Sequence, residues 1–276
     1  MRFKRAYVEI TNVCNLSCSF CAGTKREPRF MTVAEFGAAL SALRGNCEQL
    51  YLHVMGEPLL HPQLSEILET AALQGFPVNL TTNGTLLEAC GEVLCSAQAL
   101  RRVSVSLQSA ESAAEREKLL DSVFAFLEKK PADLILNLRL WNVGAAGNEG
   151  AFSRLEKYCG VEISRVPTQG THGTPLGKNT YLNLAAPFEW PDLGAKDFGT
   201  EGFCLGLRSQ IGVLADGTVV PCCLDHEGNL ALGNIFREDL SKILEGSLVR
   251  EIHAGFSDRK VVAELCRRCE YRTRFG

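Results

Sequence analysis

The chain has 276 residues, a formal net charge of −3, 46% hydrophobic residues and 22% charged residues. This composition is typical of a folded globular protein and excludes an intrinsically disordered one. No run of eighteen apolar residues occurs and the N-terminus lacks the apolar core of a signal peptide, so we expect no membrane span and a cytoplasmic location. The mild acidity provides no electrostatic footprint for nucleic acid.

Strand-like runs alternate with helix-like runs through the first 166 residues. Strands are expected at 5–11, 48–54, 77–83, 101–107, 133–141 and 161–166. Strands and helices in alternation favour a parallel sheet with right-handed crossovers. Because a complete eightfold barrel needs ~250 residues, we expect an α/β fold built on an open, partial (βα)6 TIM-type barrel.

Helices are expected between these strands, and two of them begin with a capping box. Thr32 is followed three residues later by Glu35, and Ser112 is followed by Glu115. A third helix has apolar residues at the 3.6-residue period from Leu64 and ends near Gly75.

The expected strands alternate apolar and polar side chains. A parallel strand that is buried on both faces would instead have a continuous apolar sequence. Val103 and Val105, for example, alternate with Ser104 and Ser106. Since helices supply the apolar cover outside, the polar set should point inward, and we expect the barrel lumen to be a ligand cavity. The alternative is an antiparallel sheet with one solvated face.

The pattern changes after residue 166. The next segment is rich in Gly, Thr and Pro and lacks a clear period, which is typical of a linker or a lid. In the last part of the chain, a hairpin is expected around Asp216 and Gly217, and a short helix near 237–245. We therefore expect a barrel over 1–166, a linker or lid over 167–200 and a small module over 201–276.

The chain contains twelve cysteines, and clustered thiols in a reducing compartment hold metal more often than they form disulfides. Cys14, Cys18 and Cys21 directly follow the first expected strand with the spacing C-x3-C-x2-C. A closed zinc site needs four ligands, whereas three thiolates on a 4Fe–4S cube leave one iron open for chemistry. A 4Fe–4S site is therefore favoured over zinc or thiols without metal.

The spacing C-x3-C-x-aromatic-C, with Phe20 at the aromatic position, resembles the radical S-adenosylmethionine (SAM) enzymes. A second match follows the second expected strand, where Met55, Gly56, Glu57 and Pro58 are similar to the Gly-Gly-Glu-Pro segment of that family. The resemblance implies that the backbone of this segment holds the amino group of S-adenosylmethionine. Met55 replaces the first glycine, so the tight turn is the feature to examine.

The resemblance also implies contacts from two further strands and a mechanism. Ser106 on the fourth strand and Arg139 on the fifth match positions that contact the cosubstrate in the family. The alternative for Arg139 is a salt bridge that closes the barrel. The family reduces its cluster, cleaves S-adenosylmethionine and uses the 5′-deoxyadenosyl radical to take a hydrogen atom from the substrate, with the cofactor carrying this chemistry.

The C-terminal module has a second cysteine pattern. Cys204, Cys222, Cys266 and Cys269 resemble the start of the SPASM module, in its shorter "twitch" form with one auxiliary 4Fe–4S cluster. The spacing is similar to that of the radical dehydrogenases of the butirosin pathway, which oxidise an aminocyclitol alcohol. Zinc at these four residues is the alternative. Cys223 adjoins Cys222 and could replace it.

Four protein ligands would leave the auxiliary cluster no iron for substrate. Its expected task is then to accept the electron that a substrate radical loses when it is oxidised. An alcohol oxidation also needs a base, for which Asp225 and Glu9 are the candidates. A turn-forming role is the alternative for Asp225.

The resemblance thus implies two 4Fe–4S clusters, S-adenosylmethionine and an electron donor such as flavodoxin or ferredoxin. Dehydrogenation of a small molecule is favoured. Modification of a peptide or protein is the first alternative. Only thirteen residues precede Cys14, so we expect no N-terminal leader-binding domain, although a separate subunit could supply one. A zinc-scaffolded binding module without catalysis is the second. Neither a nucleic acid nor a membrane is expected as a partner.

Overall fold

The structure, a computed structural model, describes residues 1–142, 148–168 and 173–275. Its strands form one ten-stranded sheet in the order β10-β9-β8-β1-β2-β3-β4-β5-β7-β6. Among the described residues, no helix combines the length and the apolar character that a membrane span requires.

The elements have the following bounds. The strands are β1 Arg5–Val8, β2 Leu50–Tyr51, β3 Val78–Thr82, β4 Leu100–Ser106, β5 Ile135–Leu140, β6 Thr174–Gly177, β7 Thr180–Leu184, β8 Gln210–Val213, β9 Thr218–Val220 and β10 Gly233–Asn234. The α-helices are α1 Val33–Leu43, α2 Leu64–Leu73, α3 Gly91–Ser96, α4 Ala113–Lys129, α5 Asn148–Cys159, α6 Leu240–Leu244, α7 Ser247–Ser257 and α8 Glu264–Arg267. The 3-10 helices are η1 Pro58–Leu60, η2 Leu107–Ser109 and η3 Glu270–Phe275.

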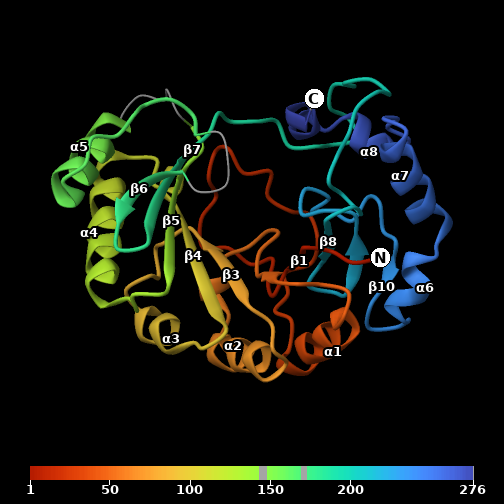
Figure 1. Ribbon diagram of the computed structural model, residues 1–276, viewed down its shortest axis with the longest axis horizontal. Coiled ribbons are helices and arrows are strands. Elements are labelled where there is room, and N and C mark those ends of the chain that lie inside the picture. Colours follow the sequence, from red (N-terminus) through yellow and green to blue (C-terminus); the bar gives the residue numbers. More distant parts are fainter. Residues whose placement is uncertain (143–147, 169–172, 276) are drawn as a thin grey trace.

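Six strands, β1 to β5 and β7, are parallel neighbours and form the partial barrel. Helices α1 to α4 lie along the outside of these strands, and α5 packs on α4 (Figure 1). The expected α/β partial barrel is therefore confirmed. Both expected capping boxes are present. The side chains of Thr32 and Ser112 accept from the backbone N–H groups of Glu35 and Glu115, and the two glutamate carboxylates accept from the backbone N–H groups of Thr32 and Ser112.

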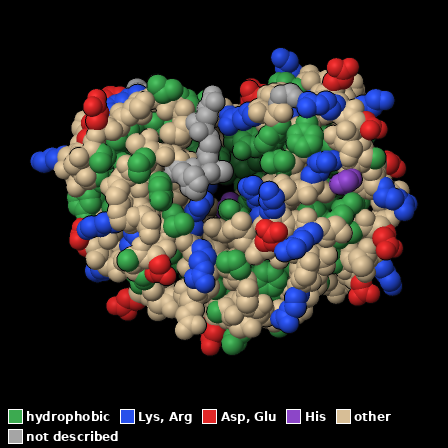
Figure 2. All heavy atoms as spheres, in the orientation of Figure 1, with side chains coloured by type: hydrophobic (Ala, Val, Ile, Leu, Met, Phe, Trp, Pro, Cys, Tyr) green, Lys and Arg blue, Asp and Glu red, His purple; other side chains and the backbone are tan. Residues whose placement is uncertain are grey.

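The alternation of side chains along the strands separates a core from a lumen. The apolar set, which includes Val103, Val105 and Leu136, is buried against the helices. The other set points inward, and ring contacts join Tyr7 to Tyr51 and His53 at centroid distances of 5.1 and 5.4 Å. Figure 2 shows a hollow in the surface between the barrel and the C-terminal helices, and Lys and Arg side chains lie beside it.

The sixth barrel strand lies later in the chain than expected. The prediction of a strand over 161–166 is wrong, because that stretch has no regular structure. Instead β7, which falls within the expected linker over 167–200, pairs in parallel with β5. A tight turn in which Lys178 and Asn179 both have positive φ joins β7 to β6. Such turns favour a hairpin, so the Gly- and Thr-rich composition concealed a strand.

The C-terminal module continues the barrel sheet. The expected hairpin is β8 and β9, and β8 pairs in parallel with β1 over residues Gln210–Val213. Gly217 has φ +86° at the turn, and a Cβ there would lie 2.4 Å from a ring carbon of Phe236, so only glycine fits. Helix α6 falls within the range expected for a short helix.

The position of the sixth strand can be tested through stability. Leu182 on β7 is fully buried, whereas Val166 is 67% exposed in the stretch that we had expected to be a strand. We expect Leu182→Ala to lower the free energy of unfolding by about 2–5 kcal/mol, because it leaves a cavity in the core. Val166→Ala should change it by less than about 0.5 kcal/mol. Urea unfolding of both variants measures this, and equal effects would contradict the assignment.

Candidate active site

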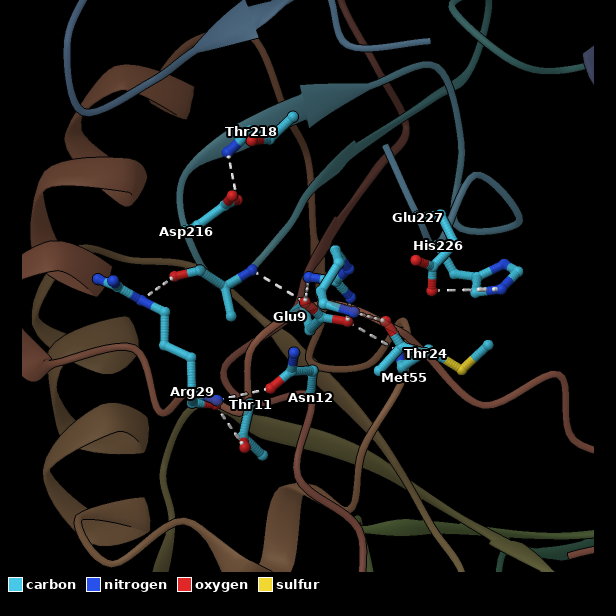
Figure 3. Close-up of polar contacts among 12 residues, drawn as sticks. Glu9, Thr11, Asn12, Thr24, Arg29, Met55, Asp216, Thr218, His226 and Glu227 are labelled. Carbon is cyan, nitrogen blue, oxygen red and sulfur yellow. Dashed lines mark hydrogen bonds and ion pairs between the residues drawn. The ribbon is translucent and has the colours of Figure 1, made fainter. Parts of the chain in front are cut away.

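The loop after β1 carries the first cysteine set and is closed at its base by hydrogen bonds. Asn12 donates its side-chain amide to the carbonyl of Glu27, at 2.9 Å, and accepts from the backbone N–H of Arg29, at 2.7 Å. Thr11 Oγ1 donates to the carbonyl of Arg29 at 2.8 Å (Figure 3). These contacts return the chain to its starting point and leave Cys14 and Cys21 exposed at the far end of the loop.

We call residues 11–29 the cluster loop. Its three thiols lie close enough to influence one another. Burial, followed by the neighbouring Cys21 and Cys14, raises the pKa of Cys18 to about 11. Backbone N–H of Gly23 points to the sulfur of Cys21 at 3.5 Å, and Asn83 Nδ2 lies 3.9 Å from that of Cys14. Such donors stabilise thiolates, which are the form that binds iron.

Glu9 joins the cluster loop to two other segments. Its side chain is fully buried. Arg26 in the loop donates to both carboxylate oxygens, at 2.8 and 2.7 Å. The backbone N–H of Met55 donates to Oε1 at 3.1 Å, and that of Ala215 in the β8–β9 turn donates to Oε2 at 2.9 Å (Figure 3). One carboxylate therefore fixes three chain segments to the end of β1.

The segment that begins at Met55 lies directly against the cluster loop. Gly56 has φ +74°, and a Cβ at this position would lie 2.4 Å from the carbonyl oxygen of Thr11. The backbone N–H of Glu57 donates to the carbonyl of Val13 at 2.8 Å. Gly56 alone thus provides the close approach, which explains how the turn forms with methionine in the preceding position.

The Glu57 side chain fixes the end of β3. Its carboxylate accepts from Thr82 Oγ1 at 2.7 Å, from the backbone N–H of Asn83 at 2.6 Å and from that of Leu59 at 3.0 Å. Burial raises its pKa against these hydrogen bonds. The carboxylate therefore holds the segment against the end of β3, while the backbone N–H of Glu57 bonds to the cluster loop.

Ser106 and Arg139 are register partners at the ends of β4 and β5. The Arg139 guanidinium stacks on Trp141, 3.7 Å from the ring centroid, and one Nη donates to Thr81 Oγ1 at 3.4 Å. Its Nε is buried without a hydrogen-bond partner among the described residues. Burial lowers the pKa of Arg139 to about 10, so the group remains charged at pH 7.

Arg139 forms no salt bridge with any residue that the structure describes, so the alternative of a bridge that closes the barrel gains no support. Phe20 lies on the cluster loop and is 42% exposed. Its carbonyl accepts from Trp190 Nε1 at 3.2 Å, which connects the loop to the chain that follows β7.

The second cysteine set comes together from three distant parts of the C-terminal module. Burial, followed by the adjoining Cys223 and then by Cys204, Cys266 and Cys269, raises the pKa of Cys222. Arg272 is buried beside the set and donates to four backbone carbonyls, those of Cys266, Glu201, Phe198 and Gly199. The arginine was not expected from the sequence, in which nothing distinguishes it from its neighbours Arg267 and Arg274.

Both residues that we expected to serve as a base are already engaged. Asp225 is buried, and its carboxylate accepts from the backbone N–H groups of Asn229 and Leu230, each at 2.8 Å. This is the turn-forming arrangement that was its alternative. Glu9 likewise accepts four hydrogen bonds. The prediction that either carboxylate acts as a base therefore gains no support.

The two sets fit iron–sulfur clusters better than single ions. A zinc ion needs its ligand atoms about 2.0–2.3 Å away from one shared centre. Among the described residues, no three His, Cys, Asp or Glu side chains converge in that way. A 4Fe–4S cluster has a separate iron for each thiolate and therefore requires no shared centre.

Removal of the Glu9 charge tests its role in holding the site together. In Glu9→Gln, one carboxylate oxygen becomes an N–H2 group that faces donors, and Arg26 loses its counter-charge. We expect the free energy of unfolding to fall by about 3–5 kcal/mol, the usual cost of breaking a buried pair. The control is Glu117→Gln, which breaks an exposed pair with Arg154 and should cost less than about 1 kcal/mol. Equal losses in denaturant unfolding would refute the role.

Two family models match the chain. The model described as the radical SAM superfamily matches residues 8–127, and the model described as the SPASM iron-sulfur cluster-binding domain matches residues 204–270. The first range contains the cluster loop, and the second contains the four cysteines of the C-terminal module.

The curated relatives include enzymes named GTP 3′,8-cyclase. The protein of that name from Synechococcus sp. (strain CC9902) is 32% identical over 309 residues, which cover 91% of this chain and 88% of the relative. The probable GTP 3′,8-cyclase of Pyrobaculum aerophilum is 32% identical, over 39% of this chain and 35% of the relative. The chain thus matches only about a third of the length of that second protein.

Solved structures share the fold. The crystal structure of BtrN in complex with AdoMet and 2-DOIA has a TM-score of 0.63 and 17% identity, and the match covers 98% of this chain and 94% of that one. Streptococcus suis SuiB bound to S-adenosylmethionine has a TM-score of 0.64 and 15% identity, over 92% and 68% of the two chains. At these identities the likeness concerns the fold alone.

Proposed function

Because the chain belongs to the radical SAM superfamily and carries a SPASM iron–sulfur module, we propose that it is an oxidoreductase that dehydrogenates a small molecule bound in its barrel lumen. The observation that carries the proposal is the pair of cysteine sets. One set follows β1, and the other lies in the C-terminal module, whose strand β8 pairs with β1. When bound, the clusters and S-adenosylmethionine supply a 5′-deoxyadenosyl radical for hydrogen abstraction and an acceptor for the second electron.

The residues of the first site have distinct tasks in this proposal. Cys14, Cys18 and Cys21 bind three irons and leave the fourth for the cosubstrate. The backbone of Met55, Gly56 and Glu57 accepts the cosubstrate's amino group, because Gly56 brings it next to the cluster loop. Phe20, Ser106 and Arg139 complete the binding site, and the stacking of Arg139 on Trp141 orients its planar donors before the cosubstrate enters.

The four cysteines of the module bind the auxiliary cluster. Arg272 lies against Cys204, Cys266 and Cys269, and its charge offsets that of the thiolates. Because it also fixes four carbonyls, it holds the surrounding chain in one arrangement. Glu9 and Asp225 act as positioning residues, and the base that receives the proton from the substrate is left to solvent or to the substrate itself.

A nucleotide cyclase is the second candidate. It is favoured by the similarity to the Synechococcus GTP 3′,8-cyclase across 91% of this chain. In that case, formation of 5′-deoxyadenosine should require GTP. A peptide-modifying activity would instead require a peptide and would leave GTP and small alcohols without effect.

The iron content and the cleavage of S-adenosylmethionine test whether the protein holds both clusters. Anaerobically purified and reconstituted protein should be brown, contain roughly eight irons per chain in two 4Fe–4S cubes, and form 5′-deoxyadenosine when reduced with S-adenosylmethionine. Iron assay and chromatography of the reaction measure both. Colourless protein with zinc at the cysteines would instead support a binding module without catalysis.

Cysteine variants separate the two clusters. The double variant Cys266→Ala and Cys269→Ala should retain about four irons and still cleave S-adenosylmethionine, because the first site is intact. It should lose the oxidised product of any substrate that stimulates cleavage in the native protein. Cys14→Ala should also retain about four irons but lose cleavage itself. Cys159→Ala, on α5, is the control and should leave all readouts unchanged. Full product formation by the double variant would overturn the electron-acceptor role.

A further inference from the structure

The chain that follows β7 crosses from the barrel to the C-terminal helices (Figure 1), and we call residues 185–191 the bridge segment. It has no regular secondary structure, yet hydrogen bonds fix it along its length. Arg274 in η3 donates to two of its backbone carbonyls, at 3.1 and 3.2 Å. The backbone N–H of Glu189 donates to the carboxylate of Glu270, also in η3, at 2.6 Å. The bridge segment is therefore held by η3.

Two aromatic rings of the bridge segment pack on the C-terminal module. Phe188 contacts Tyr271 with ring centroids 5.1 Å apart, and it contacts Trp190 at 5.6 Å. Trp190 in turn packs edge-on against His226, with ring centroids 5.3 Å apart. Tyr271 and His226 each lie within four residues of a cysteine that we assign to the auxiliary cluster. The rings therefore connect the bridge segment to the auxiliary site.

Trp190 also contacts the cluster loop. Its indole Nε1 donates to the carbonyl of Phe20 at 3.2 Å. Phe20 lies in a short turn, in which the backbone N–H of Cys21 donates to the carbonyl of Cys18 at 3.1 Å. The side chain of Phe20 is 42% exposed and gives the turn little packing of its own. Since two of the three thiols of the loop belong to this turn, the indole N–H holds residues that bind the first cluster.

The cluster loop is held from the barrel and from the C-terminal module. On the barrel side, the backbone N–H of Ser19 donates to the carboxylate of Glu111, which precedes α4, at 2.6 Å. On the module side, the backbone N–H of Lys25 donates to the carboxylate of Glu227 at 3.1 Å. Trp190 adds a second contact on the module side, and this contact reaches the turn that carries the cysteines.

Small movements of such a turn are costly for ligand binding. A binding site has to be held within about 0.5 Å of its working geometry by the groups that support it. The apparent affinity of a ligand falls with the fraction of molecules whose site is in that arrangement. A hydrogen bond that fixes the turn therefore raises the fraction of molecules that are ready to bind.

We propose that Trp190 is a positioning residue for the cosubstrate site: its indole N–H holds the cluster loop in the arrangement that binds S-adenosylmethionine. This inference rests on the proposed function, which assigns the three cysteines of the loop to the cluster that binds the cosubstrate. Because Trp190 also packs on His226, the C-terminal module takes part in binding S-adenosylmethionine at a site to which it contributes no cysteine.

Two substitutions separate the N–H group of Trp190 from its ring. In Trp190→His, the imidazole Nε2 lies as many bonds from Cβ as the indole Nε1 does, so the variant retains a donor but loses the larger ring. Trp190→Phe retains a large ring and loses the donor. If the N–H group positions the loop, Trp190→His should bind S-adenosylmethionine more tightly than Trp190→Phe. If packing alone mattered, the order would be reversed.

Equilibrium dialysis of radiolabelled S-adenosylmethionine against the oxidised, reconstituted holoprotein measures the dissociation constant. We expect Trp190→Phe to raise it about fivefold, or about 1 kcal/mol, which is the usual contribution of one hydrogen bond. Trp190→His should raise it by less. The control is Leu193→Ala, at a residue that is 45% exposed beyond the bridge segment, and it should leave the constant unchanged. The iron content should stay at roughly eight per chain in each variant, because no ligand is removed.

Thermal unfolding of the same variants reports packing, for which Trp190→Phe should be the more stable of the two. An unchanged dissociation constant in Trp190→Phe, or binding by Trp190→His that is no tighter than that by Trp190→Phe, would overturn the proposal. Native protein that binds no S-adenosylmethionine would overturn the proposed function together with this inference. Equally tight binding by the native protein and by Trp190→Phe would contradict this inference alone.

Discussion

The carboxylate of Glu9 is the contact on which the arrangement of the two cysteine sets depends. A buried carboxylate is costly unless every lone pair is matched, and here four hydrogen bonds match it. The donors come from the cluster loop, from the segment that begins at Met55 and from the turn of the C-terminal hairpin. If any one of these segments moved away, the charge would lose a partner, so all three stay docked on the end of β1.

Further contacts support the same assembly from outside. The backbone N–H of Lys25 on the cluster loop donates to the carboxylate of Glu227, two residues after Asp225, at 3.1 Å. Trp190 donates to the carbonyl of Phe20 and packs edge-on against His226, with ring centroids 5.3 Å apart. The barrel and the C-terminal module are therefore one sheet with a shared set of ties, not two bodies joined by a linker. These contacts hold the two cysteine sets in one position relative to each other, and a substrate bound between them would meet a rigid site.

Local patterns predicted much of this from the sequence. Capping boxes, strand alternation and cysteine spacing are short-range signals, and each predicts an element or a motif where it stands. The position of β7 was missed because its turn residues, Lys178 and Asn179, lie in a Gly- and Thr-rich stretch. Arg26 and Arg272 could not be recognised, since their importance arises from carboxylate and carbonyl groups that folding brings together.

Iron-edge anomalous diffraction from crystals of the reconstituted protein with S-adenosylmethionine would test the central claim most directly. The account predicts two iron centres per chain on either side of the lumen. One would be bound by three cysteines of the loop after β1, with the cosubstrate on its fourth iron, and the other by four cysteines of the C-terminal module. A fourth protein side chain on the first centre, or a single metal ion at either set, would contradict the account.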